Sequence, residues 1–428
     1  MDLTPAPLPA PPTLSPGEGR PAKATRTKMP SPCFSPLSRG RAGGAGRGAG
    51  GEGPRRRSLL LLILAALWLF ACRDHPSQPR ASLSIADTLR GSDTNGYARA
   101  LEPRDFHFPA DHGPHPEFRT EWWYYTGNLE THEGRRFGFQ LTFFRSALAP
   151  LAPDMPDRKS AWATRQAYLA HFTVTDVDGK RFHSFERWGR GALGLAGAQD
   201  APFRVWTGNW SADAVEGQVP PMRLRAAEED SAIDLILQAG RAPVLQGDQG
   251  LSHKSAEPGN ASYYYSLPRM PAAGTVRLGN QSFTVTGAAW MDREWSTSSL
   301  GRDQIGWDWF ALQLADGRDI MLYQLRRTDG SADPASSGTV SGPTGEGRHL
   351  GINDVSLTVL DHWRNSRSGA VYPSRWRLRI PSEKLDLEIT PLLADQELDV
   401  SFRYWEGAVA VTGTQNGRGY VELTGYTR

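Results

Sequence analysis

Cysteine and long apolar runs are scarce in this chain of 428 residues. Its two cysteines are Cys33 and Cys72, and Cys33 lies in a segment rich in proline, glycine and arginine, so a disulfide framework is not expected. The apolar run at residues 59–71 has 13 residues, fewer than the roughly 20 that a membrane-spanning helix needs. A sustained 3.6-residue hydrophobic period is also absent, which argues against a helical fold.

An excess of positive charge is found only at the start of the chain. Residues 1–71 carry ten lysines and arginines against three acidic residues. Because the net charge of the whole chain is +2, the residues after position 71 carry a net charge of about −5. A mildly acidic body lacks the basic footprint that nucleic-acid binding needs, and we expect no nucleic-acid partner.

The N-terminal segment has the pattern of a lipoprotein leader. Its first part is rich in proline, glycine, alanine and arginine and cannot bury a core. A basic triplet at 55–57 then precedes the apolar run 59–71, as in a signal peptide, and the run ends at Cys72 like a bacterial lipobox. We therefore expect residues 1–71 to be a disordered leader plus signal peptide and 72–104 to be a lipidated tether.

An ordinary signal peptide followed by an incidental Cys72 is the alternative interpretation of this segment. Arg73, and not aspartate, follows the cysteine, so the usual cue for retention in the inner membrane is missing. We expect a cell-envelope lipoprotein on the periplasmic face of the outer membrane, held there by acyl chains on Cys72.

The body of the chain has a β pattern. Aromatic-rich runs at 121–129 and 136–144 flank a turn with Gly134, and a second pair of runs flanks the Asp178-Gly179 turn. Short strands separated by Gly, Asn and Asp turns predict an all-β antiparallel barrel or sandwich.

A similar aromatic hairpin recurs in the second half, at residues 307–326. When Leu129 is aligned with Leu314, Asn128 matches Gln313 and two neighbouring aromatic pairs coincide. This weak internal duplication predicts two similar barrels.

The stretch 287–310 gathers tryptophans around carboxylates. Exposing several tryptophan side chains to water is unfavourable, so we expect them to form a buried or ligand-facing apolar wall. Carboxyl groups within such a wall must be ion-paired, hydrogen-bonded or neutral. Asp292 and Glu294 flank Arg293 and share one face if the segment is a strand. Three interpretations are open: an arginine-paired polar cluster at the junction of the barrels, a catalytic acid, or a group that orients a ligand.

Other chemical patterns point to no cofactor and no metal. His107, His112 and His115 have no standard zinc spacing, and the serines near Ser296 lie in no nucleophile elbow, so a serine hydrolase is not expected. His171 lies in an alternating strand, either as a ligand contact or as a satisfied core histidine.

Four long segments resemble the AttH/CrtC family, the lipocalin-like group that includes carotenoid 1,2-hydratases and predicted secreted hydrolases. They are H-P-E-F-R-T-E-W-W-Y-Y-T-G-N-L from His115, A-S-Y-Y-Y-S from Ala261, the stretch 287–310, and Y-W-E-G-A-V with G-R-G-Y-V-E-L-T-G-Y between Tyr404 and Tyr426.

The resemblance covers residues 105–428. It implies two consecutive lipocalin-like antiparallel β-barrels, at 105–297 and 298–428, with an apolar cavity. It also implies that lipid-anchored members accompany ABC-type export permeases, and that some members hydrate an isolated alkene.

In the family's Trp-x-Asp element Asp292 is the candidate general acid, with Glu294 as a second candidate. Tyr263–Tyr265 stand where the hydratase branch is expected to have histidine and tryptophan.

The resulting expectation is a periplasmic protein that binds an apolar small molecule or lipid, accessory to an ABC-type export system. The alternatives are a carotenoid 1,2-hydratase-like enzyme and a non-catalytic structural adaptor. An inward, poorly paired Asp292 would favour the enzyme over the carrier. The expected ligand contacts are Trp290, Trp295, Trp307, Trp309, Tyr263, Tyr265, His171 and Trp123.

Overall fold

The computed structural model describes residues 94–151, 160–298 and 300–426, all within one compact unit of the chain. The predicted leader at 1–71 and the predicted lipidation site Cys72 lie outside these residues. No helix in the described ranges is long and apolar enough to cross a membrane.

The described residues form two antiparallel sheets, which confirms the predicted all-β fold class. The 3-10 helices are η1 (Ala110–His112), η2 (Ile352–Asp354) and η3 (Pro381–Glu383). The first sheet contains β1 (Thr120–Glu130), β2 (Arg136–Ala147), β3 (Gln166–Asp176), β4 (Arg181–Arg190), β5 (Ala196–Asp200), β6 (Phe203–Thr207), β7 (Trp210–Val215), β8 (Gln218–Glu228), β9 (Ser231–Leu237), β10 (Val244–Leu245), β11 (Leu251–His253), β12 (Ala261–Leu278) and β13 (Gln281–Ser296). The second contains β14 (Gln304–Leu314), β15 (Asp319–Arg327), β16 (Ser337–Ser341), β17 (Gly347–Gly351), β18 (Ser356–Arg364), β19 (Val371–Ile380), β20 (Leu385–Pro391), β21 (Glu397–Leu398), β22 (Tyr404–Gly413) and β23 (Gly417–Leu423).

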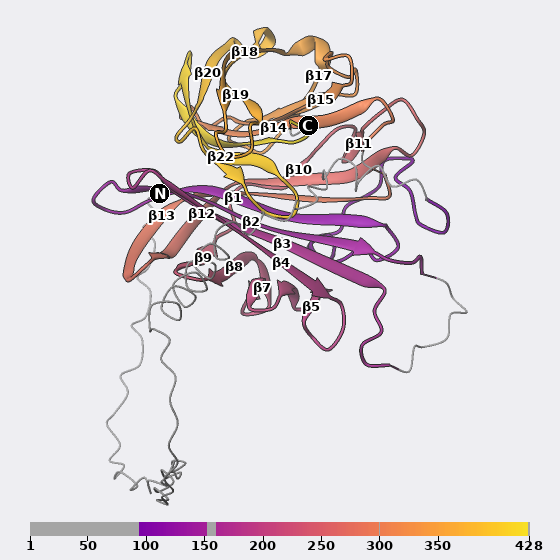
Figure 1. Cartoon of the computed structure of the whole chain (residues 1–428). Helices are drawn as coiled ribbons and strands as arrows, with labels where there is room; N and C mark the ends of the chain where they lie inside the picture. The colour runs from indigo at the N-terminus through magenta and orange to yellow at the C-terminus, as the bar shows by residue number, and fades with distance from the viewer. Residues whose placement is uncertain (1–93, 152–159, 299, 427–428) are drawn as a thin grey trace, which may run out of the picture. The chain divides into compact units, whose positions relative to one another are not determined.

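Each sheet curls around its own core. The first has the order β4-β3-β2-β1-β13-β12-β9-β8-β7-β6-β5, and β4 at one end contacts β5 and β6 at the other. The second has the order β17-β16-β15-β14-β23-β22-β20-β19-β18, and its orange to yellow strands form a ring in Figure 1. Both sheets therefore have the barrel-like form that was predicted.

Strict alternation decides which side chains enter which core. On β1, β12 and β13, one set of side chains packs inside the first sheet, with Tyr125, Tyr265 and Trp295 among them. The alternate set, with Tyr124 and Trp290, joins residues of the second sheet in a separate apolar cluster. Because successive side chains on a strand point to opposite faces, these aromatic runs supply two cores at once.

The strand registers support the internal duplication. In β1 and β13 Leu129 lies opposite Gly287, and in β14 and β23 Leu314 lies opposite Gly417. Counting along both pairs from these positions matches Asp292 with Glu422.

Two hydrogen bonds between the sheets obey the same relation. Asn128 Nδ2 donates to the Gly419 carbonyl at 3.0 Å, and Gln313 Nε2 donates to the Ala289 carbonyl at 3.2 Å. Asn128 corresponds to Gln313 and Gly419 to Ala289, so a rotation that places each sheet on the other also interchanges the two bonds. This is what a local two-fold relation requires.

A buried ion cluster holds the face of β13 that is turned toward the core of the first sheet. Glu121 Oε1 accepts from Arg145 Nε, and Glu121 Oε2 accepts from Arg293 Nη2. All three side chains are at most 1 % exposed. The Arg293 guanidinium also lies 4.0 Å from the centre of the Trp123 ring, a cation–π contact.

Three local features interrupt the regular strand pattern. A turn at Gly208, which has φ +61°, separates β6 from β7. The Ser- and Gly-rich segment 329–347 contains β16. The long strand β12 has an irregularity between Leu267 and Met270.

Candidate functional site

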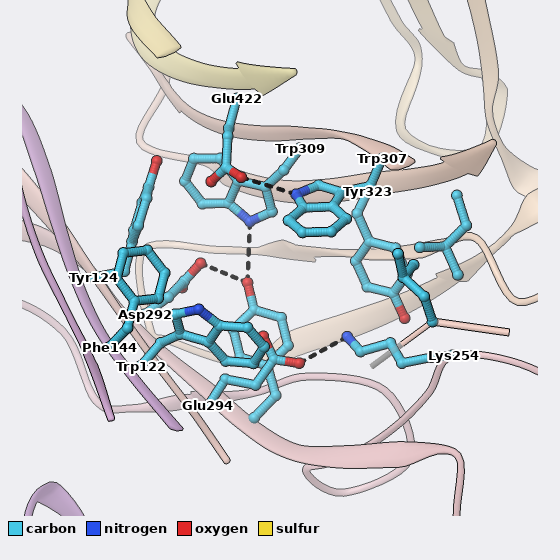
Figure 2. Close-up of a pocket in the computed structure, with 13 residues that line it drawn as sticks. Trp122, Tyr124, Phe144, Lys254, Asp292, Glu294, Trp307, Trp309, Tyr323 and Glu422 are labelled. Carbon is cyan, nitrogen blue, oxygen red and sulfur yellow. Dashed lines mark hydrogen bonds and ion pairs between the residues drawn. The ribbon is translucent and has the colours of Figure 1, made fainter. Parts of the chain in front are cut away.

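A partly open cavity of about 100 Å³ lies between the two sheets, bordered by β1, β12 and β13 on one side and β14, β15 and β23 on the other (Figure 2). This volume has room for several waters or the end of an apolar chain. The site thus uses the outer faces of both sheets. It is lined by Trp122, Tyr124, Phe144, Lys254, Tyr264, Asp292, Glu294, Leu300, Trp307, Trp309, Tyr323, Leu325 and Glu422.

Asp292 is a buried acid held entirely by neutral donors. Tyr264 Oη donates to its Oδ2 at 2.5 Å, while Ser266 Oγ and Trp290 Nε1 donate to its Oδ1 at 2.5 and 2.7 Å. No cationic side chain in the described ranges forms an ion pair with it. The nearby cation, Lys254, binds Glu294 instead, with Nζ and Oε1 2.9 Å apart.

Burial raises the pKa of Asp292 to about 7 despite these three hydrogen bonds, which lower it. The nearby Glu294 carboxylate contributes a further rise in that pKa. An aspartic acid with this pKa still carries a proton in a substantial fraction of molecules at neutral pH, as general acid catalysis requires.

Glu422 is a second acid on the facing wall, and no sequence pattern had indicated it. Its Oε1 accepts from Trp307 Nε1 at 3.1 Å. Burial raises its pKa to about 8, with further contributions from Asp292 and Glu294. Its match with Asp292 follows from aligning Gly417 with Gly287, which the strand registers provide and the alignment of Leu129 with Leu314 does not reach.

Tyr264 joins the two halves of the site. Its hydroxyl donates to Asp292 and accepts from Trp309 Nε1 at 3.1 Å. The Tyr124 and Trp309 rings meet edge to face, with centroids 4.9 Å apart. Aromatic rings and two acids of raised pKa, Asp292 and Glu422, therefore line the cavity together.

The structure divides the expected ligand contacts between two faces. Trp307 and Trp309 line the cavity, and Trp290 binds Asp292 beside it. The others lie elsewhere: Trp123, Tyr263, Tyr265 and Trp295 pack inside the first sheet, and His171 contacts Tyr404.

Alternation accounts for this division, since residues 263, 265 and 295 each adjoin a residue that faces the cavity. The Trp295 ring instead stacks on His115 at 3.7 Å, and Tyr265 Oη lies 2.6 Å from His112 Nδ1.

The interpretation of Asp292, Arg293 and Glu294 as one arginine-paired cluster is corrected by the same alternation. Arg293 points into the core of the first sheet and binds Glu121, on the opposite face from Asp292. Glu294, a candidate catalytic residue, accepts from Ser262 Oγ at 2.5 Å and pairs with Lys254. Its charge is therefore compensated, whereas that of Asp292 is not.

No group of three or more histidine, cysteine, aspartate or glutamate side chains among the described residues is arranged to hold a metal ion. His115 and Asp111 do meet, with Nε2 and Oδ1 3.1 Å apart, but they form an ion pair with Arg104 as a third member.

The profile of the AttH-like family matches residues 99–426. The chain belongs to the AttH-like family. The crystal structure of a candidate AttH from Nitrosomonas europaea is 35 % identical, covers 77 % of this chain and 99 % of its own, and superposes with a TM-score of 0.69. No curated protein matches the sequence.

A second solved structure shares the fold. Kievitone hydratase from Nectria haematococca is 15 % identical, with 78 % of this chain and 98 % of that one covered and a TM-score of 0.58. At this identity the likeness of the AttH-like chain to the hydratase concerns the fold alone.

Proposed function

We propose that this AttH-like protein catalyses acid-initiated addition to, or isomerisation of, a carbon–carbon double bond in an apolar small molecule. The observation that supports it is Asp292, a buried acid on an aromatic cavity wall with neutral hydrogen-bond partners. An inward, unpaired acid is the feature expected to distinguish an enzyme from a carrier.

The chemistry follows from the groups that line the cavity. Asp292 gives its proton to one alkene carbon: the O–H bond breaks and the π electrons form the new C–H bond. Aromatic faces, those of Trp122 and Trp309 among them, stabilise the cation on the neighbouring carbon. In hydration a water then forms the C–O bond, and its proton passes to the Glu422 carboxylate.

This cycle needs the two acids to share one proton. Below about pH 7 both carry protons and no base is available, and above about pH 8 both are ionised and no acid is available. The form with one proton therefore has its largest population between these two pKa values. Because Glu422 has the higher pKa, that proton lies mostly on Glu422, and the reaction proceeds from the minor form in which Asp292 holds the proton and Glu422 is ionised.

Turnover of a simple isoprenoid alkene in D₂O tests the proposal. We expect deuterium on carbon in the product, with a rate that peaks between about pH 7 and 8. Asp111→Asn, a buried aspartate outside the cavity, is the matched control and should retain turnover. Absence of carbon-bound deuterium from every alkene in a panel of different chain lengths would overturn the enzymatic proposal.

Carriage of an apolar ligand is the second candidate function, because the same aromatic lining suits an apolar chain. Native mass spectrometry of the purified mature protein separates the two. An intact apolar ligand, bound equally by wild type and Asp292→Asn and never converted, would support the carrier.

The location and partner are proposed from the sequence alone. We propose a lipoprotein anchored through Cys72 to the periplasmic face of the outer membrane and serving an ABC-type permease. Cys72→Ser should move the protein from the membrane fraction to the soluble periplasm, and an unchanged distribution would contradict the anchor.

A further inference from the structure

A second group of buried polar side chains lies behind the cavity, and the proposed reaction does not use it. His171 on β3 and Glu406 on β22 are fully buried, and Tyr404 is 2 % exposed. Buried polar groups of this kind are costly unless they are paired, so their arrangement calls for a reason.

The outer end of the group reaches the surface at a groove. Glu186 lines this groove together with Ser401 and three further acidic residues. Its Oε1 accepts from Ser401 Oγ at 2.5 Å, while its Oε2 lies 3.3 Å from His171 Nε2. The other ring nitrogen, His171 Nδ1, lies 2.7 Å from Tyr404 Oη. Glu186, His171 and Tyr404 are therefore linked in series.

The inner end reaches the cavity. Tyr404 and Glu406 lie two positions apart on β22 and share one face of the strand, so their side chains are neighbours. Glu406 lies directly opposite Glu422 in the register of β22 and β23. Side chains opposed in this way have Cβ atoms about 5 Å apart, so the two carboxyls are immediate neighbours. Glu422 is labelled on the cavity wall in Figure 2.

Glu406 is suited to carry a proton. Tyr124 Oη donates to its Oε1, whereas Oε2 has no hydrogen-bond partner in the described part of the chain. An ionised oxygen without a partner would be expensive here, but a hydroxyl at Oε2 can turn toward Tyr404 or Glu422. Burial, followed by the charge of Glu422, raises the pKa of Glu406 well above its ordinary value.

We propose that Glu186, His171, Tyr404 and Glu406 form a proton path from the surface groove to Glu422. The path rests on the proposed function, because it would exchange protons between solvent and the acid pair after each turnover. Its members other than Glu422 are positioning residues, since none of them touches the alkene.

One concerted shift moves a proton inward without leaving a charge on the intermediate groups. Glu406 first gives its proton to an ionised Glu422 and becomes ionised itself. A proton that Glu186 takes up from water in the groove then passes to His171 Nε2, and Nδ1–H passes to the Tyr404 oxygen. The Tyr404 hydroxyl proton passes to Glu406, so that Glu186 ends ionised and Glu406 neutral. Burial lowers the pKa of His171, which favours the neutral ring that both ends of this shift require.

Hydrogen–deuterium exchange of the buried carboxylic acid tests the path without any substrate. The carbonyl stretch of a protonated carboxyl shifts when its hydrogen is replaced by deuterium, and the infrared band lost in Glu406→Gln identifies Glu406. The whole mature protein is transferred into D₂O and the shift is followed in time. The variants are Tyr404→Phe, which removes one oxygen, and Glu186→Gln at the groove. Thr173→Val, a buried isosteric change on β3, is the matched control.

We expect exchange within the mixing time in wild type and Thr173→Val. In Tyr404→Phe exchange should slow at least about tenfold, because deuterium would enter only through transient opening of the sheets. Glu186→Gln should also slow the exchange, and it provides the test if Tyr404→Phe does not fold. Exchange as fast in both variants as in wild type would overturn the path and show a structural network.

The two proposals fail separately in this design. If exchange is slower in the Tyr404 and Glu186 variants but no alkene is turned over, the proton path stands and the enzymatic function is rejected. If exchange is unchanged in these variants but an alkene is turned over, the enzymatic function stands and the path is rejected.

Discussion

Asp292→Asn is expected to stabilise the folded protein at alkaline pH while lowering turnover by roughly 10²–10⁴-fold. The pKa of Asp292 is about 7 in the fold against an ordinary value of 3.8, so the folded state binds the proton more tightly than the unfolded state. The stability that comes from this group is present in full below pH 3.8 and is lost as the pH rises through 7. Asparagine does not ionise, so the variant keeps what wild type loses, on the order of 3–4 kcal/mol above pH 8.

Chemical denaturation at pH 5 and pH 8.5 measures this effect. Asp111→Asn is the matched control, because Asp111 is as buried as Asp292 but His115, a backbone N–H and Arg104 lower its pKa. Its stability contribution is present above the ordinary pKa and is lost in acid, so this variant should be less stable than wild type at both pH values. An Asp292→Asn protein less stable than wild type at pH 8.5 would show that the carboxyl is ionised and well paired.

Glu121→Gln is expected to lower the free energy of unfolding at pH 7 by about 3–5 kcal/mol, because it leaves two buried arginines, Arg145 and Arg293, without their shared counter-ion. Their remaining partners are mostly backbone carbonyls, such as that of Phe118, which carry no net charge. The two guanidinium groups hold the pKa of Glu121 far below its ordinary value. Wild type therefore loses this stabilisation as the pH falls below about 4.5, and the difference between the proteins should shrink in acid.

Urea unfolding of the two proteins at pH 7 and pH 3.5 checks the prediction. The exposed Glu117, four residues earlier, supplies the control, and Glu117→Gln should change stability by no more than about 0.5 kcal/mol. Equal stability of Glu121→Gln and Glu117→Gln at pH 7 would mean that solvent or other groups compensate the arginines.

Local pattern was sufficient to predict the β fold and the side of β13 that holds Asp292 and Glu294. The period of two in a strand is fixed by backbone geometry, so positions 292 and 294 had to share a face. The same rule, applied to Tyr263–Tyr265, separates the middle tyrosine from the outer two. It does not say which face of β12 meets a second sheet, and the expectation chose the outer two.

The partners of the site could not be predicted in this way. Glu422 lies 130 positions after Asp292, and its proximity depends on how the two sheets pack. Lys254 reaches Glu294 from a short segment next to β11 that has no periodic signal. Only the duplication linked distant positions, and Asn128 with Gln313 was its visible part. That alignment relates β1 to β14, whereas the match of Asp292 with Glu422 relates β13 to β23 at a different spacing and needs the strand registers.

The local two-fold relation between the sheets has a consequence for the division of labour between the two acids. If the two halves of the cavity were identical, an alkene could enter in either of two equivalent orientations, and either acid could protonate it. The halves differ, because Tyr124 corresponds to Trp309 and Trp290 to Tyr420. These differences, with aspartate facing glutamate, make the two orientations unequal, so that one acid acts as the proton donor and the other as the acceptor.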